Sequence, residues 1–200
     1  MDWLLYENEA HQQGYNVVCG VDEAGRGPLA GPVFAAAVVL PNDVIIEGVN
    51  DSKKLSEKKR ELLFDVIKEK ALSYSIASAS EKEIDDINIL NATYLAMQRA
   101  IQGLSIEADI ALIDGNRLPK LDIDAKAIIK GDSLSMSIAA ASILAKVSRD
   151  RLMLELSKEY PQYQFEKHKG YGTALHRELI KQYGPCPIHR LTFLKNIIGK

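Results

Sequence analysis

The 200-residue chain contains only two cysteines, Cys19 and Cys186. Two thiols cannot build a disulfide framework or a cysteine-based zinc site, so we expect a protein of the reducing cytoplasm. The amino terminus lacks the apolar run of a signal peptide. The most apolar long stretch, residues 138–145, ends at Lys146 and is too short to span a bilayer. We therefore expect no membrane association.

Several catalytic signatures are missing as well. Gly25-x-Gly27 lacks the third glycine of a dinucleotide-binding loop and leads into a predicted strand rather than a helix. No Walker A lysine follows a glycine-rich loop, and no His-Glu-x-x-His zinc motif occurs. The histidines show no general acid–base pairing, so we expect them mainly in hydrogen bonds at the surface or in the core. They are His11, His168, His176 and His189.

Charge is present in quantity but is distributed unevenly. Hydrophobic residues make up 46% of the chain and charged residues 26%, which suits one globular domain with a substantial core. The net charge of -2 argues against a generally basic nucleic-acid-binding surface. Residues 165–200, however, contain seven basic and two acidic residues. We expect a catalytic core over residues 1–160 and, over 161–200, a basic helical extension of the same domain that binds a polyanion backbone.

Apolar periodicity and turn residues predict a mixed α/β sheet of five strands with flanking helices. The strands are predicted near residues 16–22, 33–40, 73–78, 109–113 and 127–129. The helices are predicted near residues 3–12, 56–70, 80–103, 135–160 and 173–184. Ser56 is a candidate N-cap, and Ser80 with Glu83 matches a capping box.

Acidic residues stand where predicted strands end. Asp22 and Glu23 follow the first strand, Asp114 the fourth and Asp132 the fifth, each with a glycine close by. Ligands of α/β sheets collect at strand ends, so these carboxylates can converge. Four carboxylates in one place imply two divalent ions such as Mg²⁺ or Mn²⁺, which can activate a water and stabilise the leaving oxygen of a phosphodiester.

The adjacency of Asp22 and Glu23 poses a geometric problem, because neighbouring residues of a regular strand point to opposite faces of the sheet. We therefore expect the strand to turn or bulge at Glu23, which Gly25 and Gly27 make sterically possible. Asp150 would lie about 27 Å from Asp132 along a helix, too far to share a metal. We interpret Asp150 as a pairing or capping residue.

Several longer segments match the sequence motifs of a known family. They are Gly20–Val33, Asn50–Leu55, Ile113–Asn116, Lys130–Ser133, Ser137–Val147, Arg149-Asp150, His168–Thr173 and His189-Arg190. In these segments the chain resembles the bacterial ribonucleases HII, the type 2 ribonuclease H family. The resemblance covers residues 16 to 195 or so, and its motifs are long and occur in the same order.

The resemblance implies a ribonuclease H-like fold and a metal-dependent endonuclease. Such enzymes cut the RNA of RNA–DNA hybrids and incise 5′ of single ribonucleotides in duplex DNA, leaving 3′-hydroxyl and 5′-phosphate ends, as in ribonucleotide excision repair. RNA–DNA hybrids and ribonucleotide-containing DNA are then the expected partners of a monomeric enzyme.

The resemblance also implies roles for particular residues. Asp22, Glu23, Asp114 and Asp132 match the family's metal-binding carboxylates. Gly25-Arg26-Gly27 matches the tripeptide that senses the ribose 2′-hydroxyl, and glycine allows close backbone approach to that group. Tyr171 matches the tyrosine beside the neighbouring deoxyribose. Ser52, Lys53 and Lys146 are candidate phosphate contacts.

Two alternatives remain open at the level of sequence. A resolvase or a type 3 ribonuclease H would also cluster acids, although the type 3 enzymes carry an additional amino-terminal substrate-binding domain. A non-catalytic hybrid-binding protein would be expected to lose at least one of the four acids, and all four are present.

Overall fold

The computed structural model describes residues 2–199 and contains one five-stranded sheet in the order β3-β2-β1-β4-β5. The strands are β1 (Val18–Ala24), β2 (Val33–Val39), β3 (Ser73–Ala79), β4 (Ile110–Asp114) and β5 (Asp124–Ile128). The β1–β2 and β2–β3 pairs are antiparallel, whereas β1–β4 and β4–β5 are parallel. The predicted mixed sheet flanked by helices is confirmed.

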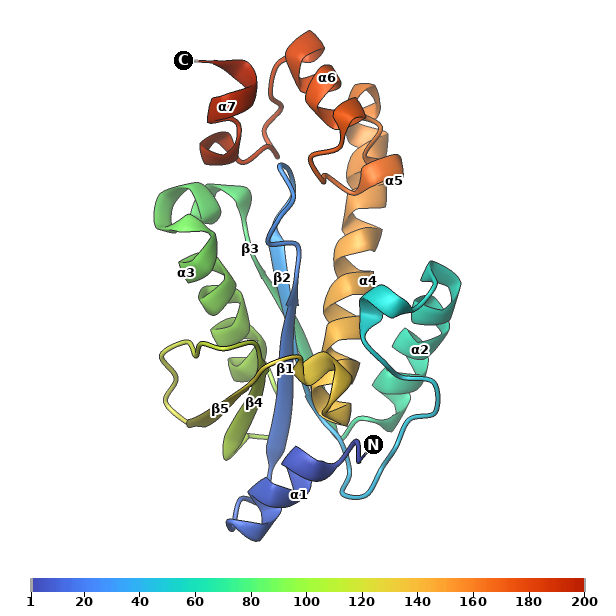
Figure 1. Cartoon of the computed structure of the whole chain (residues 1–200), viewed down its shortest axis with the longest axis vertical. Helices are drawn as coiled ribbons and strands as arrows, with labels where there is room; N and C mark the ends of the chain where they lie inside the picture. The colour runs from blue at the N-terminus through green and yellow to red at the C-terminus, as the bar shows by residue number, and fades with distance from the viewer. Residues whose placement is uncertain (1, 200) are drawn as a thin grey trace.

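Helices cover both faces of the sheet, as Figure 1 shows. The long helices are α2 (Glu57–Lys70), α3 (Glu81–Gln102) and α4 (Met136–Glu159). Helix α3 packs on one face, and α2 and α4 pack on the other. Helix α4 approaches β1 very closely at Gly20, where an added Cβ would lie 2.2 Å from the backbone carbon of Ser137.

Shorter elements complete the chain. They are α1 (Leu5–Gln12), α5 (Phe165–His168), α6 (Ala174–Tyr183), α7 (Lys195–Ile198), and the 3-10 turns η1 (Ser52–Lys54), η2 (Gly131–Ser133), η3 (Pro161–Tyr163) and η4 (Leu191–Phe193). The elements after α4 gather at the end of the sheet where β1 turns into β2 (Figure 1). Among residues 2–199, no helix combines the length and the apolar character that crossing a membrane requires.

The predicted helix caps are present. Ser56 accepts a hydrogen bond from the Lys59 N–H, and Ser80 and Glu83 form both halves of the capping box. The fifth strand differs from the prediction, because it spans Asp124–Ile128 rather than residues 127–129. Parallel pairing with β4 draws three residues upstream of Ala127 into the sheet, while Ile129 is exposed.

Candidate active site

Three carboxylates converge at the ends of β1 and β4. Val21 of β1 pairs with Ile113 of β4, so Asp22 and Asp114 each lie one residue beyond the last paired position. The Gly131 N–H donates to Asp114 Oδ1 over 2.7 Å and thereby brings η2 against the strand end. One carboxylate oxygen from each of Asp22, Asp114 and Asp132 then lies within 4.8 Å of the other two.

The electrostatics of this triad fit a hard divalent cation. Burial, and then repulsion from Glu23 and Asp114, raise the pKa of Asp22 well above its usual range. Burial and the Asp114 charge likewise raise the pKa of Asp132. Partial burial by itself would lower the pKa of Lys53. The attraction of the nearby aspartates outweighs this effect, so the pKa of Lys53 is raised. The donors are all carboxylate oxygens, the ligands that Mg²⁺ and Mn²⁺ prefer.

Glu23 does not share the face of the triad. The β1–β2 register continues one residue to one residue from Cys19–Val39 to Ala24–Phe34. The expected turn or bulge at Glu23 is therefore wrong, because both strands of the pair remain regular past this residue. The chain turns only at Gly25, which has φ +96°.

The side chain of Glu23 consequently lies on the α3 face. It lines a hollow with Thr93, Tyr94 and Met97 of α3, whereas Asp22 faces α4. Burial raises the pKa of Glu23, the adjacent Arg26 opposes this rise, and the Asp114 charge adds to it. The Glu23 carboxylate is thus close enough to the triad to feel its charge, and it accepts a 3.4 Å hydrogen bond from Arg26.

A groove of about 380 Å³ lies beside Glu23. Its lining includes all the predicted substrate contacts: Gly25, Arg26, Gly27, Ser52, Lys53, Lys146 and Tyr171. These residues come from the β1–β2 loop, η1, α4 and the segment after α5, so the fold gathers four separate parts of the chain. Glu23 borders the same groove and connects it to the acidic site.

The groove residues differ in how freely they can meet a ligand. Ser52 is buried, and its hydroxyl lies 2.8 Å from that of Ser142. Lys146 donates to Asp150 over 2.6 Å. Tyr171, by contrast, is 41% exposed. The ring of Tyr171 is therefore the more accessible recognition surface.

Asp150 is paired, as the sequence indicated. Its carboxylate accepts from Lys146, and Arg60 Nη2 lies 3.7 Å away. The neighbouring arginines bind elsewhere: Arg151 pairs with Glu61, and Arg149 turns toward the β1–β2 loop.

Sequence reasoning missed two buried arginines that hold the β1–β2 loop. Arg149 donates from Nε to the Pro32 carbonyl over 3.1 Å, from Nη2 to Ala30 over 2.9 Å and from Nη1 to Lys169 over 2.9 Å. Its guanidinium carbon also lies 5.8 Å from the centre of the Tyr171 ring. One side chain thus fixes the loop and contacts the tyrosine.

Arg190 holds the other part of the loop. It donates from Nη2 to the Gly25 carbonyl over 2.6 Å, from Nη1 to Arg26 over 3.0 Å and from Nε to Gly31 over 2.8 Å. Burial, and then the nearby Arg149 charge, lower the pKa of Arg190 to about 9. Within residues 2–199, no carboxylate lies within ion-pairing distance of either guanidinium. The presence of Arg190 in a family motif was the only sequence signal for this role.

Arg190 belongs to a carboxy-terminal segment that docks directly on the loop. His189 forms a β-bridge with Ala30, and the Gly31 N–H donates to the Ile188 carbonyl over 2.9 Å. Arg190 is therefore not one of the exposed cations expected to bind a polyanion backbone, and Lys200 lies outside the described residues. Exposed Lys167, Lys181 and Lys195 remain candidates for that role.

Replacing Gly25 by Ala should destabilise the loop. An added Cβ would lie 2.1 Å from Arg149 Nε, and the positive φ adds a strain of about 1–2 kcal/mol. Gly14→Ala is the matched control, since Gly14 has the same φ of +96° but no atom within 4 Å of the added Cβ. Chemical denaturation should show Gly25→Ala to be the less stable variant by roughly 2 kcal/mol or more. Equal losses would show that Arg149 is not packed against Gly25.

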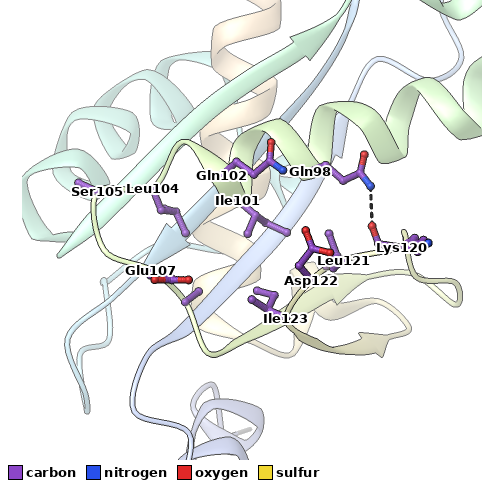
Figure 2. A pocket seen from close by; sticks show the side chains of 11 residues that line it. Gln98, Ile101, Gln102, Leu104, Ser105, Glu107, Lys120, Leu121, Asp122 and Ile123 are labelled. Atoms are coloured by element: carbon purple, nitrogen blue, oxygen red, sulfur yellow. Dashed lines mark hydrogen bonds between the residues drawn. The ribbon is translucent and has the colours of Figure 1, made fainter.

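A second hollow of about 470 Å³ lies at the opposite end of β4 (Figure 2). It is lined by the end of α3, the chain leading into β4 and the chain leading into β5. Gln98 reaches across it to donate to the Lys120 carbonyl over 2.6 Å. Glu107 and Asp122 are its acidic residues, and it contains none of the nominated site residues.

Comparison with known proteins agrees with this geometry. The sequence model of ribonuclease HII matches residues 19–196, a span that contains the triad, the groove and Arg190. The chain belongs to the ribonuclease HII family. It is a ribonuclease H hydrolase, and the prediction of the family and of its fold is confirmed.

Relatives of nearly the same length support the assignment. Ribonuclease HII of Caldicellulosiruptor bescii is 61% identical over 99% of this chain and 96% of its own length. That of Idiomarina loihiensis is 60% identical over 88% of this chain and 95% of its own. Among solved structures, ribonuclease H2 of Pyrococcus horikoshii superposes with a TM-score of 0.76 at 30% identity, covering 92% of this chain and 97% of that one.

The type 3 enzymes are more distant. A ribonuclease HIII crystallised with Mn²⁺ superposes with a TM-score of 0.68, but it is 22% identical and is covered over only 65% of its length. This likeness concerns the fold. Because the matching family model is that of ribonuclease HII, the type 3 alternative is not retained.

Replacing Asp22 by Asn should stabilise the metal-free protein. The raised pKa of Asp22 means that the fold disfavours its charged form, so a neutral isostere should gain on the order of 1 kcal/mol, or about 2–4 °C. The gain should shrink as pH falls, because folded Asp22 takes up a proton at higher pH than the unfolded chain does. Thermal unfolding in a chelator at pH 8 and pH 5 measures both effects.

Asp150→Asn is the control for this experiment. Asp150 is also buried, but it is paired with Lys146 and Arg60, so its replacement should destabilise the protein. Loss of stability in Asp22→Asn at pH 8 would contradict our conclusion that burial and repulsion disfavour the charge of Asp22 in the folded protein.

Proposed function

We propose that this ribonuclease HII cuts RNA in RNA–DNA hybrids and incises 5′ of single ribonucleotides in duplex DNA, leaving 3′-hydroxyl and 5′-phosphate ends. The observation that carries the proposal is a groove that contains Gly25, Arg26, Gly27 and Tyr171 and is bordered by Glu23, whose carboxylate is close enough to the acidic triad to feel the Asp114 charge. A phosphodiester held at the carboxylates would have its sugar beside that loop.

Two divalent ions, Mg²⁺ or Mn²⁺, would serve as cofactors. Asp22, Asp114 and Asp132 would hold one ion, and Glu23, on the other face of β1, would complete the second site. When bound, the ions supply Lewis acidity, which lowers the pKa of the attacking water and stabilises charge on the leaving 3′ oxygen. The raised pKa values of Asp22, Glu23 and Asp132 favour this reading, since burial first and then repulsion between the carboxylates disfavour their charged forms unless a cation neutralises them.

The β1–β2 loop offers donors for the 2′-hydroxyl. Within residues 2–199, the N–H groups of Arg26 and Gly27 donate to no protein acceptor. The carbonyls of the same two peptide units accept from Arg190, and a cation bound at the carbonyl strengthens the N–H of its amide as a donor. These two amides are therefore suited to read a ribose oxygen at close range.

Tyr171 would complete the sugar site. An added Cβ at Gly27 would lie 4.0 Å from Tyr171 Cε1, so the ring stands directly beside the loop. There it would contact the adjoining deoxyribose and crowd an additional hydroxyl. Lys53 and Lys146 would bind the flanking phosphates, and the buried Ser52 hydroxyl would do so only on releasing Ser142.

Within residues 2–199, no histidine lines the groove or belongs to the triad, where a mechanism in which the 2′-hydroxyl attacks would need one, and His11 of α1 bonds the Tyr15 carbonyl instead. His168, His176 and His189 are buried and make hydrogen bonds away from the triad. Water is therefore the proposed nucleophile, and its attack would leave a 5′-phosphate.

Three duplexes test the proposal: one with a single ribonucleotide in DNA, one RNA–DNA hybrid and one of DNA alone. Each is incubated with the protein and Mg²⁺ or Mn²⁺, and cleavage positions are mapped on end-labelled strands. We expect cutting 5′ of the ribonucleotide and at several places in the hybrid. Equal cutting of the all-DNA duplex would refute the proposed specificity, and binding without cutting would refute the enzymatic role.

A further inference from the structure

Three of the four histidines lie buried together behind the proposed sugar site. His168 ends α5, His176 is in the first turn of α6, and His189 is in the docked carboxy-terminal segment. The rings of His168 and His176 stack with centres 4.3 Å apart, and the centres of His176 and His189 are 5.2 Å apart. The proposed mechanism uses none of the three.

Their hydrogen bonds allow only one arrangement of protons. The Cys186 N–H donates to His189 Nδ1 over 2.9 Å, so that nitrogen carries no proton and Nε2 must carry it. His189 Nε2 lies 3.1 Å from His176 Nε2, which must therefore accept. His176 Nδ1 then carries the proton and donates over 3.0 Å to the carbonyl of Tyr171.

The neighbouring groups agree with neutral rings. The Cys186 thiol, whose pKa burial raises to about 11, lies 3.1 Å from His189 Nδ1 and can donate to it as well. Burial lowers the pKa of His176 and of His189 to about 4 each. His168 accepts from the Gly170 N–H at Nδ1, and its Nε2 lies 3.0 Å from the Tyr163 carbonyl, which fixes its proton on Nε2.

The chain of bonds ends on a residue of the groove. The Tyr171 carbonyl accepts from His176, while the ring of Tyr171 stands exposed beside Gly27. At the other end, His189 immediately precedes Arg190, which holds the Gly25 and Arg26 carbonyls. The histidines therefore connect the two elements that we assign to sugar recognition.

We propose that His176 and His189 are positioning residues that set the place of Tyr171 relative to the Gly25–Gly27 loop, and so determine selectivity for a single ribonucleotide in DNA. This inference rests on the proposed function. The direction of the bonds gives each ring nitrogen of His176 a distinct role. Its Nδ1 holds Tyr171, and its Nε2 receives the bond from His189.

Two amide substitutions separate these roles. His176→Asn places an N–H donor near the Nδ1 position and keeps the bond to Tyr171, whereas His176→Gln places its amide near the Nε2 position and loses that bond. We expect both to lower stability similarly. His176→Gln should reduce the ratio of single-ribonucleotide to hybrid cleavage about tenfold, equivalent to one hydrogen bond of about 1.4 kcal/mol. His176→Asn should stay within about twofold of the wild-type ratio.

Equal ratios in the two variants would overturn the positioning role, whether both kept or both lost selectivity. Ring ¹⁵N NMR of the wild-type protein provides an independent test, since it distinguishes the tautomers of each histidine. We expect His176 to be protonated on Nδ1, with His168 and His189 protonated on Nε2 at neutral pH. Any other set would refute the chain of bonds. A wild-type protein that cuts neither substrate would refute the proposed function instead. The histidine tautomers alone would then test whether the hydrogen bonds run from His189 through His176 to Tyr171.

Discussion

Asp114→Asn should lower the rate of single-turnover cleavage at least about 10³-fold, with substrate binding retained. The substitution removes a negative charge from the centre of the triad, where Asp114 repels both Asp22 and Asp132. It preserves shape, and the amide oxygen can still accept from the Gly131 N–H that holds η2 in place. The loss should therefore come from weakened metal binding. Rates measured against Mn²⁺ concentration test for weakened metal binding. Circular dichroism shows whether loss of folding contributes instead.

Asp124→Asn is the matched control. Asp124 begins the neighbouring strand β5, and its carboxylate accepts from the Tyr15 hydroxyl far from the triad. Surface substitutions usually leave stability nearly unchanged, and Asp124 is not part of the triad. Cleavage by this variant should therefore stay within about twofold of wild type. An Asp114→Asn protein that keeps a tenth of the wild-type rate would contradict the role of the triad.

Arg190→Met should destabilise the protein by about 3–5 kcal/mol and slow cleavage of a single ribonucleotide in the fraction that remains folded. The methionine fills much of the volume but leaves the Gly25, Arg26 and Gly31 carbonyls without their donors. The loop that we assign to the 2′-hydroxyl would then lose both its fixed position and the polarisation of its amides. Urea unfolding and cleavage assays at a temperature where the variant is folded measure the two effects.

Lys181→Met serves as the control for Arg190→Met, because Lys181 is an exposed cation of the same extension. It should change stability by no more than about 0.5 kcal/mol. Similar effects of Arg190→Met and Lys181→Met would show that the buried guanidinium does not hold the loop.

The sequence predicted those elements whose position depends on local side-chain patterns. Ser56 and the Ser80–Glu83 box mark helix starts because capping depends on residues a few positions apart. The meeting of Asp22 with Asp114 follows from parallel strands that end at one edge of the sheet. Strand β5 was misplaced because its residues, Asp124–Ile128, alternate weakly and depend on pairing with β4.

Other features depend on partners that carry no sequence signal. The unbroken register with β2 determines which face of the sheet Glu23 occupies. Asp22 and Glu23 are neighbours in sequence, but their side chains therefore lie on opposite faces. Arg149 and Arg190 bind backbone carbonyls, and every residue has a carbonyl, so no pattern of side chains identifies their targets. The direction of the histidine chain likewise follows only from the N–H of Cys186 in the folded tail.

The most direct test of the account is the chemistry of the cut ends on a DNA duplex that contains one ribonucleotide. We predict that cleavage requires a divalent cation, stops in a chelator, and yields a 3′-hydroxyl on the upstream fragment and a 5′-phosphate on the fragment that begins with the ribonucleotide. Cleavage that persists in the chelator, or that leaves a 2′,3′-cyclic phosphate, would contradict hydrolysis at the site formed by Asp22, Asp114 and Asp132.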